Sequence, residues 1–221
     1  MIFLLLIIPM ILGFWAQMRV SSAFKKYKQV RIVSNLTGAQ AASQILNAAN
    51  IHDVEVVEIN GMLGDHYDPT SKRLCLSSDV YRTPSVAAVG IAAHECGHAI
   101  QHAAAYAPLK LRAMIVPITQ FSSQILPFVL IGGFLFHMMQ LVTLGIVCYV
   151  ILAVFQVITL PVEFDATRRA KIILPKMGII QPGEETLGVD RVLNAAALTY
   201  VAALVATIGN LIYLVMVRNR N

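Results

Sequence analysis

Residues 141–160 read LVTLGIVCYVILAVFQVITL, a continuous run without a charged residue. A helix that crosses a bilayer needs about 20 predominantly apolar residues, so this run is long enough to span a membrane. The whole chain of 221 residues is 57% hydrophobic and 13% charged, whereas a soluble domain carries about 25% charged residues. Too few polar side chains remain to cover a water-soluble protein of this size. The sequence therefore predicts a mainly α-helical membrane protein.

Three further stretches are apolar enough to span, at residues 1–17, 113–136 and 195–217. The first has no basic residue before its apolar core, unlike a secretory signal, and we interpret it as an uncleaved anchor. The second contains Pro117 and Pro127 and several polar residues, so it needs neighbouring helices to satisfy its backbone. A buried soluble helix is the alternative for that stretch. About four transmembrane helices are expected.

The basic residues predict the orientation of these helices. Residues 18–112 hold ten of the 17 Lys and Arg and residues 163–194 hold five, while the turn at 137–140 holds none. By the positive-inside rule, the two basic segments face the cytoplasm. The net charge of +5 comes without a basic patch interleaved with aromatic residues, so nucleic-acid binding is not expected.

Residues 18–110 are long enough for a small α+β domain. We expect a helix at 37–49 capped by Thr37, strands at 53–59 and 72–77 with a turn at 68–71 between them, and a helix at 85–106 ended by Pro108. A β-hairpin and a long helix therefore form this domain.

The 85–106 helix contains His94-Glu95-Cys96-Gly97-His98, which matches H-E-x-x-H. An i,i+4 spacing places both imidazoles on one helix face, where both Nε2 atoms can reach one Zn²⁺. Glu95 is displaced from that face and suits a general base that deprotonates water activated by the zinc. Two histidines on an ordinary helix surface are the alternative reading.

A catalytic zinc needs a third protein ligand. His102 lies roughly two turns from a metal held between His94 and His98, beyond reach. The metzincin and site-2 protease patterns require downstream residues that this chain lacks. A Glu from a following helix remains, and Glu163 is preferred, with Asp165 as the alternative.

Ordinary structural roles are the alternative for the acidic residues of this region. Glu184 and Glu185 follow Pro182-Gly183 in an expected loop and are interpreted as solvated or helix-capping. Glu163 itself could instead pair with a neighbouring arginine, Arg168 or Arg169.

Four segments carry a resemblance that covers nearly the whole chain. They are GDHYDPTSKRLCLSSDVY (64–81), AAHECGHAIQ (92–101), LPVEFDATRRA (160–170) and VLNAAALTYVAA (192–203). The chain resembles the YugP-like neutral zinc metallopeptidases, bacterial membrane proteins distantly similar to the HtpX and CAAX-prenyl protease group of gluzincins.

The resemblance implies that zinc is held by His94, His98 and Glu163, with Glu95 as the base. In HtpX-like enzymes an Asp four residues after that Glu orients a zinc histidine. Here Thr167 occupies that position and the nearby acid is Asp165, on another helix face. Asp165 is therefore expected near the ligands, without a settled role.

The same enzymes bind an extended substrate along a strand that precedes the zinc helix. By that likeness Asp65, His66 and Tyr67 lie on the substrate-binding edge, and His66 could stabilise the oxyanion. A turn histidine that caps the loop at Asp68 is the alternative for His66.

These inferences give one expected organisation: a transmembrane anchor (1–17), a cytoplasmic zinc-protease domain (18–110), a transmembrane helical hairpin (111–162), a cytoplasmic segment with the third ligand (163–194), and a last span with its tail (195–221). We expect a multi-pass zinc metalloendopeptidase of a bacterial cell membrane, acting on polypeptide or membrane-protein substrates at the cytoplasmic face. A metal-binding membrane scaffold or regulatory subunit without proteolytic activity is the alternative.

Overall fold

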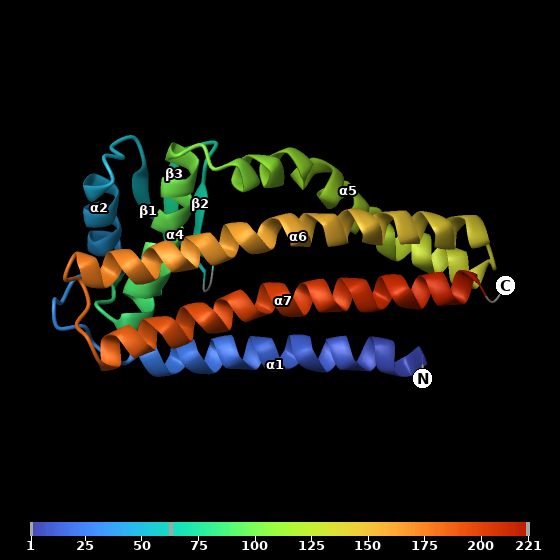
Figure 1. The fold of residues 1–221 in the computed structure, drawn as a ribbon, viewed down its shortest axis with the longest axis horizontal. Helices are drawn as coiled ribbons and strands as arrows, with labels where there is room; N and C mark the ends of the chain where they lie inside the picture. Colours follow the sequence, from blue (N-terminus) through green and yellow to red (C-terminus); the bar gives the residue numbers. More distant parts are fainter. Residues whose placement is uncertain (1, 62–63, 220–221) are drawn as a thin grey trace. The chain divides into compact units, whose positions relative to one another are not determined.

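The computed structural model describes residues 2–61 and 64–219 and is mainly helical, with one small sheet (Figure 1). Its elements are α1 (Ile2–Lys28), α2 (Gly38–Ala48), β1 (Glu55–Ile59), β2 (His66–Asp68), β3 (Arg73–Ser77), α3 (Ser78–Arg82), α4 (Val86–Ala103), α5 (Ala107–Leu135), α6 (Met139–Lys176) and α7 (Glu184–Arg218). This architecture confirms the fold class that composition and hydropathy predict.

Four helices in the described part of the chain are long and apolar enough to cross a membrane. These candidate spans are Ile7–Lys28, Ala107–Leu135, Met139–Lys176 and Glu184–Arg218. Each helix continues beyond the apolar run that identified it in the sequence. Most of residues 163–194 is therefore helical, as the end of α6 and the start of α7.

The chain divides into two compact units. An apolar unit contains Met1–Gln17, Lys110–Pro161 and Leu198–Asn221, and a mixed unit contains Met18–Leu109 and Val162–Ala197. The candidate site residues all belong to the mixed unit. That unit also contains the whole sheet, α2, α3 and α4.

Two polar caps define the helices of the mixed unit. Thr37 forms a capping box with Gln40 at the start of α2, as expected for this residue type. The Ser85 hydroxyl accepts a hydrogen bond from the Ala88 N–H and begins α4. α4 ends at Ala103, earlier than predicted, because the chain turns through a positive φ of 52° at Ala105. Proline 108 instead lies in the first turn of α5, where its missing N–H is tolerated.

The sheet contains a strand that the sequence pattern missed. Its order is β1-β3-β2, with β1 parallel and β2 antiparallel to β3. The expected hairpin of strands 53–59 and 72–77 is wrong, because β1 and β3 are parallel, and the hairpin is formed by β2 and β3. Its turn is closed by Asp68, which accepts hydrogen bonds from the Thr70 N–H and the Ser71 hydroxyl. β2 has only three residues, too few to show an alternating pattern. It is one of the two edges of the sheet.

A close helix crossing brings α4 against α6 within the mixed unit. A Cβ atom added at Gly97 would lie 2.8 Å from the Ala166 carbonyl oxygen and 3.0 Å from its Cα. Only glycine permits this approach. Cys96, beside it, is fully buried and donates from Sγ to the Ala42 carbonyl oxygen.

Candidate metal centre

Three side chains from two helices converge in the mixed unit. α4 presents His94 and His98 on one face, and α6 presents Glu163. Glu163 Oε2 lies 3.3 Å from His94 Nε2 and 3.7 Å from His98 Nε2. One ligand atom from each of the three residues lies within 4.8 Å of the others. The carboxylate of Glu163 is only 2% exposed, so its charge needs a compensating partner.

The donor set fits a zinc ion. In a tetrahedral zinc site with bonds of about 2.0–2.2 Å, ligand atoms lie about 3.3–3.6 Å from one another. The spacings of Glu163 Oε2 to the two Nε2 atoms match that range with little adjustment. Two imidazoles and one carboxylate are a common protein ligand set for catalytic zinc, which keeps a fourth position open. The predicted cluster is therefore assembled by the fold.

Thr167 contacts the first histidine. Its hydroxyl oxygen lies 3.2 Å from His94 Nδ1, the ring nitrogen that does not face Glu163. Thr167 follows Glu163 by four residues, so both project from one face of α6. The position of Thr167 was noted from the sequence, but its contact with His94 was not predicted.

Gln101 contacts the second histidine and was missed entirely. Its Oε1 lies 3.0 Å from His98 Nδ1, and its Nε2 donates to the Val162 carbonyl oxygen and to Asp165 Oδ2. Asp165 also accepts hydrogen bonds from the neighbouring arginines Arg168 and Arg169. Asp165 therefore reaches His98 through Gln101, and its oxygens face Gln101 and the arginines. The spacing of three residues from His98 is the signal that could have identified Gln101.

Glu95 is held beside the cluster by the edge strand. Its side chain is buried, and its Oε2 accepts a hydrogen bond of 3.1 Å from the Tyr67 N–H on β2. Burial raises the pKa of Glu95 above its ordinary value, and the charges of Glu163 and Asp65 add to this, while His94 and His98 act in the opposite direction.

His98 carries a perturbed imidazole. Burial opposes its charged form, but the hydrogen bond to Glu163 and the negative charges of Glu95 and Glu163 outweigh burial. The pKa of His98 is therefore raised above its ordinary value. The negative charges of Glu95 and Glu163 would also attract a divalent cation to this position.

The three residues expected on the substrate edge differ in their surroundings. Asp65 accepts hydrogen bonds from the Ser77 N–H and hydroxyl, and burial raises its pKa. His66 is exposed, and its Nδ1 donates to the Gly64 carbonyl oxygen over 2.7 Å. The Tyr67 hydroxyl lies 2.8 Å from His102 Nδ1. His102 thus contacts a residue outside the cluster.

The carboxylates at the start of α7 lie elsewhere. Glu185 was expected to be solvated or to cap a helix from a loop, but it is a buried residue of α7. Its two oxygens accept hydrogen bonds from the N–H groups of Val33 and Gln181. Its burial was missed because the N–H of Val33 comes from a segment far away in the sequence.

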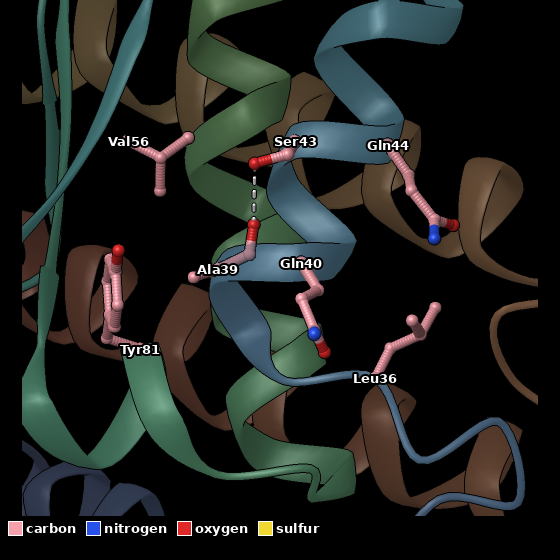
Figure 2. Close-up of a pocket in the computed structure, with 7 residues that line it drawn as sticks. All are labelled: Leu36, Ala39, Gln40, Ser43, Gln44, Val56 and Tyr81. Atoms are coloured by element: carbon pink, nitrogen blue, oxygen red, sulfur yellow. Dashed lines mark hydrogen bonds between the residues drawn. The ribbon is translucent and has the colours of Figure 1, made fainter.

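A separate hollow lies between α2, β1 and α3 (Figure 2). Its lining consists of Leu36, Ala39, Gln40, Ser43, Gln44, Val56 and Tyr81. Ser43 bonds within its own helix, to the Ala39 carbonyl. None of the candidate ligands His94, His98 and Glu163 lines this hollow.

Comparison with known proteins agrees with this geometry. Residues 2–219 match the family described as "Putative neutral zinc metallopeptidase". The chain is 44% identical over 218 residues to the "Putative membrane protease YugP" of Bacillus subtilis (strain 168), covering 98% of this chain and 96% of that protein. No solved structure matches the chain. With two helices that bring His94, His98 and Glu163 together and a family match over nearly all its length, the chain belongs to this neutral zinc metallopeptidase family.

Proposed function

We propose that the protein is a membrane-embedded zinc endopeptidase that hydrolyses peptide bonds at the cytoplasmic face. The observation that carries the proposal is the position of Glu95, a buried carboxylate on the same helix as two of the ligand candidates and held by a main-chain N–H. A carboxylate beside a His, His, Glu cluster is the arrangement that metal-assisted hydrolysis requires.

Each residue has a definite task in this mechanism. His94, His98 and Glu163 would hold a zinc ion, which would supply a Lewis acid for acidifying water and polarising a peptide carbonyl. Glu95 takes the proton from the attacking water and delivers it to the leaving amine.

The substrate we propose is an extended polypeptide that adds a strand along β2. β2 is an edge of the sheet, so no other described strand pairs with its outer side. Main-chain pairing at such an edge recognises a polypeptide with little dependence on its sequence. Asp65, His66 and Tyr67 would line that edge, and His66 would stabilise the oxyanion.

The cytoplasmic orientation rests on charge. Residues 18–112 and 163–194 carry 15 of the 17 basic residues and include the whole candidate site. Polypeptides and membrane proteins exposed on the cytoplasmic side are therefore the proposed substrates.

Substitution of Glu95 by Gln tests the proposal. The amide keeps the size of the side chain but cannot take a proton, so hydrolysis of casein should fall by about 10²–10⁴-fold. Zinc measured by elemental analysis should stay at the wild-type content. Glu184→Gln, at an exposed position in the first turn of α7, is the matched control and should cleave normally. A Glu95→Gln protein that cuts at the wild-type rate contradicts the proposal, and a zinc-loaded wild type that cuts nothing favours the scaffold alternative.

A further inference from the structure

Gln101 makes a complete set of hydrogen bonds at a buried position beside the metal centre. Its side chain is 0% exposed. Oε1 lies 3.0 Å from His98 Nδ1, and Nε2 lies 2.8 Å from the Val162 carbonyl oxygen and 3.0 Å from Asp165 Oδ2. Rotating the amide by 180° would place its oxygen against two acceptors, which a buried group does not tolerate. The orientation of the amide is therefore fixed by chemistry.

The fixed amide determines the tautomer of His98. A carbonyl and a carboxylate only accept hydrogen bonds, so the NH₂ group of Gln101 must face Val162 and Asp165. Its oxygen then faces His98 and needs a donor, which requires a hydrogen on Nδ1. In a neutral imidazole with Nδ1–H, Nε2 carries the lone pair, and Nε2 is the atom directed toward Glu163.

We propose that Gln101 is a positioning residue of the metal centre, which holds His98 in the metal-binding tautomer, and that Asp165 acts on His98 only through Gln101. The inference rests on the proposed function insofar as His98 must bind zinc. Partners behind a zinc histidine fix its orientation and raise its affinity for the metal.

The charges around Asp165 explain why an amide stands between it and the histidine. The side chains of Arg168 and Arg169 contact its two oxygens, so its negative charge is balanced at the surface of α6. Asp165 holds the Gln101 amide, and the amide orients His98 without adding a charge beside the buried carboxylates Glu95 and Glu163. A carboxylate at position 101 would meet Asp165 with a like charge and would lose both donor contacts.

Gln101→Met is the central test, because methionine has a similar length and cannot make these hydrogen bonds. We expect the zinc dissociation constant, measured by competition with a chromophoric chelator, to rise about 10–100-fold. The absorption bands of the cobalt-substituted protein should also shift, since a loosened His98 changes the ligand geometry. Gln44→Met, at an exposed position on α2, is the matched control and should leave both values unchanged. A Gln101→Met protein with zinc affinity within twofold of wild type and an unchanged cobalt spectrum overturns the proposal.

A double-mutant cycle tests the indirect action of Asp165. Asp165→Leu should weaken zinc binding less than Gln101→Met, by about 2–10-fold, because the Val162 carbonyl still holds the amide. The double variant should bind zinc no more weakly than Gln101→Met alone. Additive losses would show that Asp165 acts on the metal by another route. If Gln101→Met does not fold, zinc binding by Asp165→Leu tests the proposal alone. A zinc affinity within twofold of wild type would then show that Asp165 does not act on His98 through Gln101.

These readouts separate the inference from the proposed function. Zinc affinity and the cobalt spectrum are measured without a substrate, whereas the peptidase proposal depends on cleavage by wild type and its loss in Glu95→Gln. If Gln101→Met binds zinc normally and Glu95→Gln abolishes cleavage, only the proposed role of Gln101 is contradicted. If the wild-type protein binds zinc but cleaves no substrate, only the proposed peptidase activity is contradicted.

Discussion

The Tyr67 N–H donates a hydrogen bond to Glu95 Oε2 over 3.1 Å, so the edge strand β2 orients the carboxylate that follows His94 in the sequence. The donor is a main-chain atom, and most substitutions at position 67 preserve it. The Tyr67 hydroxyl makes a separate contact, to His102 Nδ1. Backbone and side chain of one residue therefore have different roles that mutation can separate.

Tyr67→Pro and Tyr67→Ala separate these roles. Both remove the phenol, but only proline removes the N–H, and proline is tolerated on an edge strand. We expect cleavage to be about 10-fold lower in Tyr67→Pro than in Tyr67→Ala, because Glu95 loses its only described main-chain donor, a loss of roughly 1.4 kcal/mol. Zinc content should be equal in both. Equal cleavage rates in the two variants would show that the N–H does not orient the base.

Thr167→Val should weaken metal binding without unfolding the protein. Valine has the shape of threonine but lacks the hydroxyl that faces His94 Nδ1. The zinc dissociation constant, measured by chelator competition, should rise about 10-fold, and Thr167→Ser should restore most of the affinity. A serine variant as weak as the valine variant would indicate that the methyl group, and not the hydroxyl, matters.

Gly97→Ala should separate the two helices that carry the candidate metal ligands. The new Cβ would lie 2.8 Å from a backbone oxygen of Ala166, so α4 and α6 must move apart. We expect a stability loss of about 1–3 kcal/mol in thermal unfolding and weaker zinc binding. Gly13→Ala is the control, since a Cβ there meets nothing within 4 Å. An unchanged melting temperature for Gly97→Ala would contradict the close crossing.

Asp65 should make stability depend on pH in the acidic range. Burial raises its folded pKa above the ordinary value, so the folded protein holds a proton that the unfolded chain has already lost. Stability from this group is present at low pH and is lost as pH rises through the folded pKa. The melting temperature of Asp65→Asn minus that of wild type should therefore become more positive between about pH 3.5 and pH 7. A difference that stays constant or falls with pH would contradict the raised pKa.

Chelation should destabilise the protein as well as inactivate it. Zinc bound by α4 and α6 at a free concentration 100 times its dissociation constant would add about 2.7 kcal/mol of stability. The melting temperature should fall on treatment with chelator and recover with added zinc. His94→Ala should show neither change, and a wild-type response in that variant would place the metal elsewhere.

The candidate site residues were easier to predict from the sequence than the pairing of the β-strands. His94, Glu95 and His98 are close in sequence and share a helix, so their geometry follows from helical periodicity alone. Glu163 could be chosen because the other acids were few and fitted worse. The resemblance then supported the same choice, and the fold brings this residue to the histidines.

The missed features depend on long-range contacts. β2 has three residues and gains its pairing from β3, and Gln101 acquires its role only when α6 supplies Val162 and Asp165. Glu185 is buried because the N–H of Val33 reaches it from far away in the sequence. Local sequence patterns do not contain these partners.

The distribution of the ligands along the chain has a consequence for biosynthesis. His94 and His98 are translated well before Glu163, and the candidate span Ala107–Leu135 and much of α6 lie between them. A nascent chain therefore carries an incomplete metal site until the third candidate span has been synthesised. Under the proposed function, a peptidase would therefore become competent only after most of its candidate membrane segments exist.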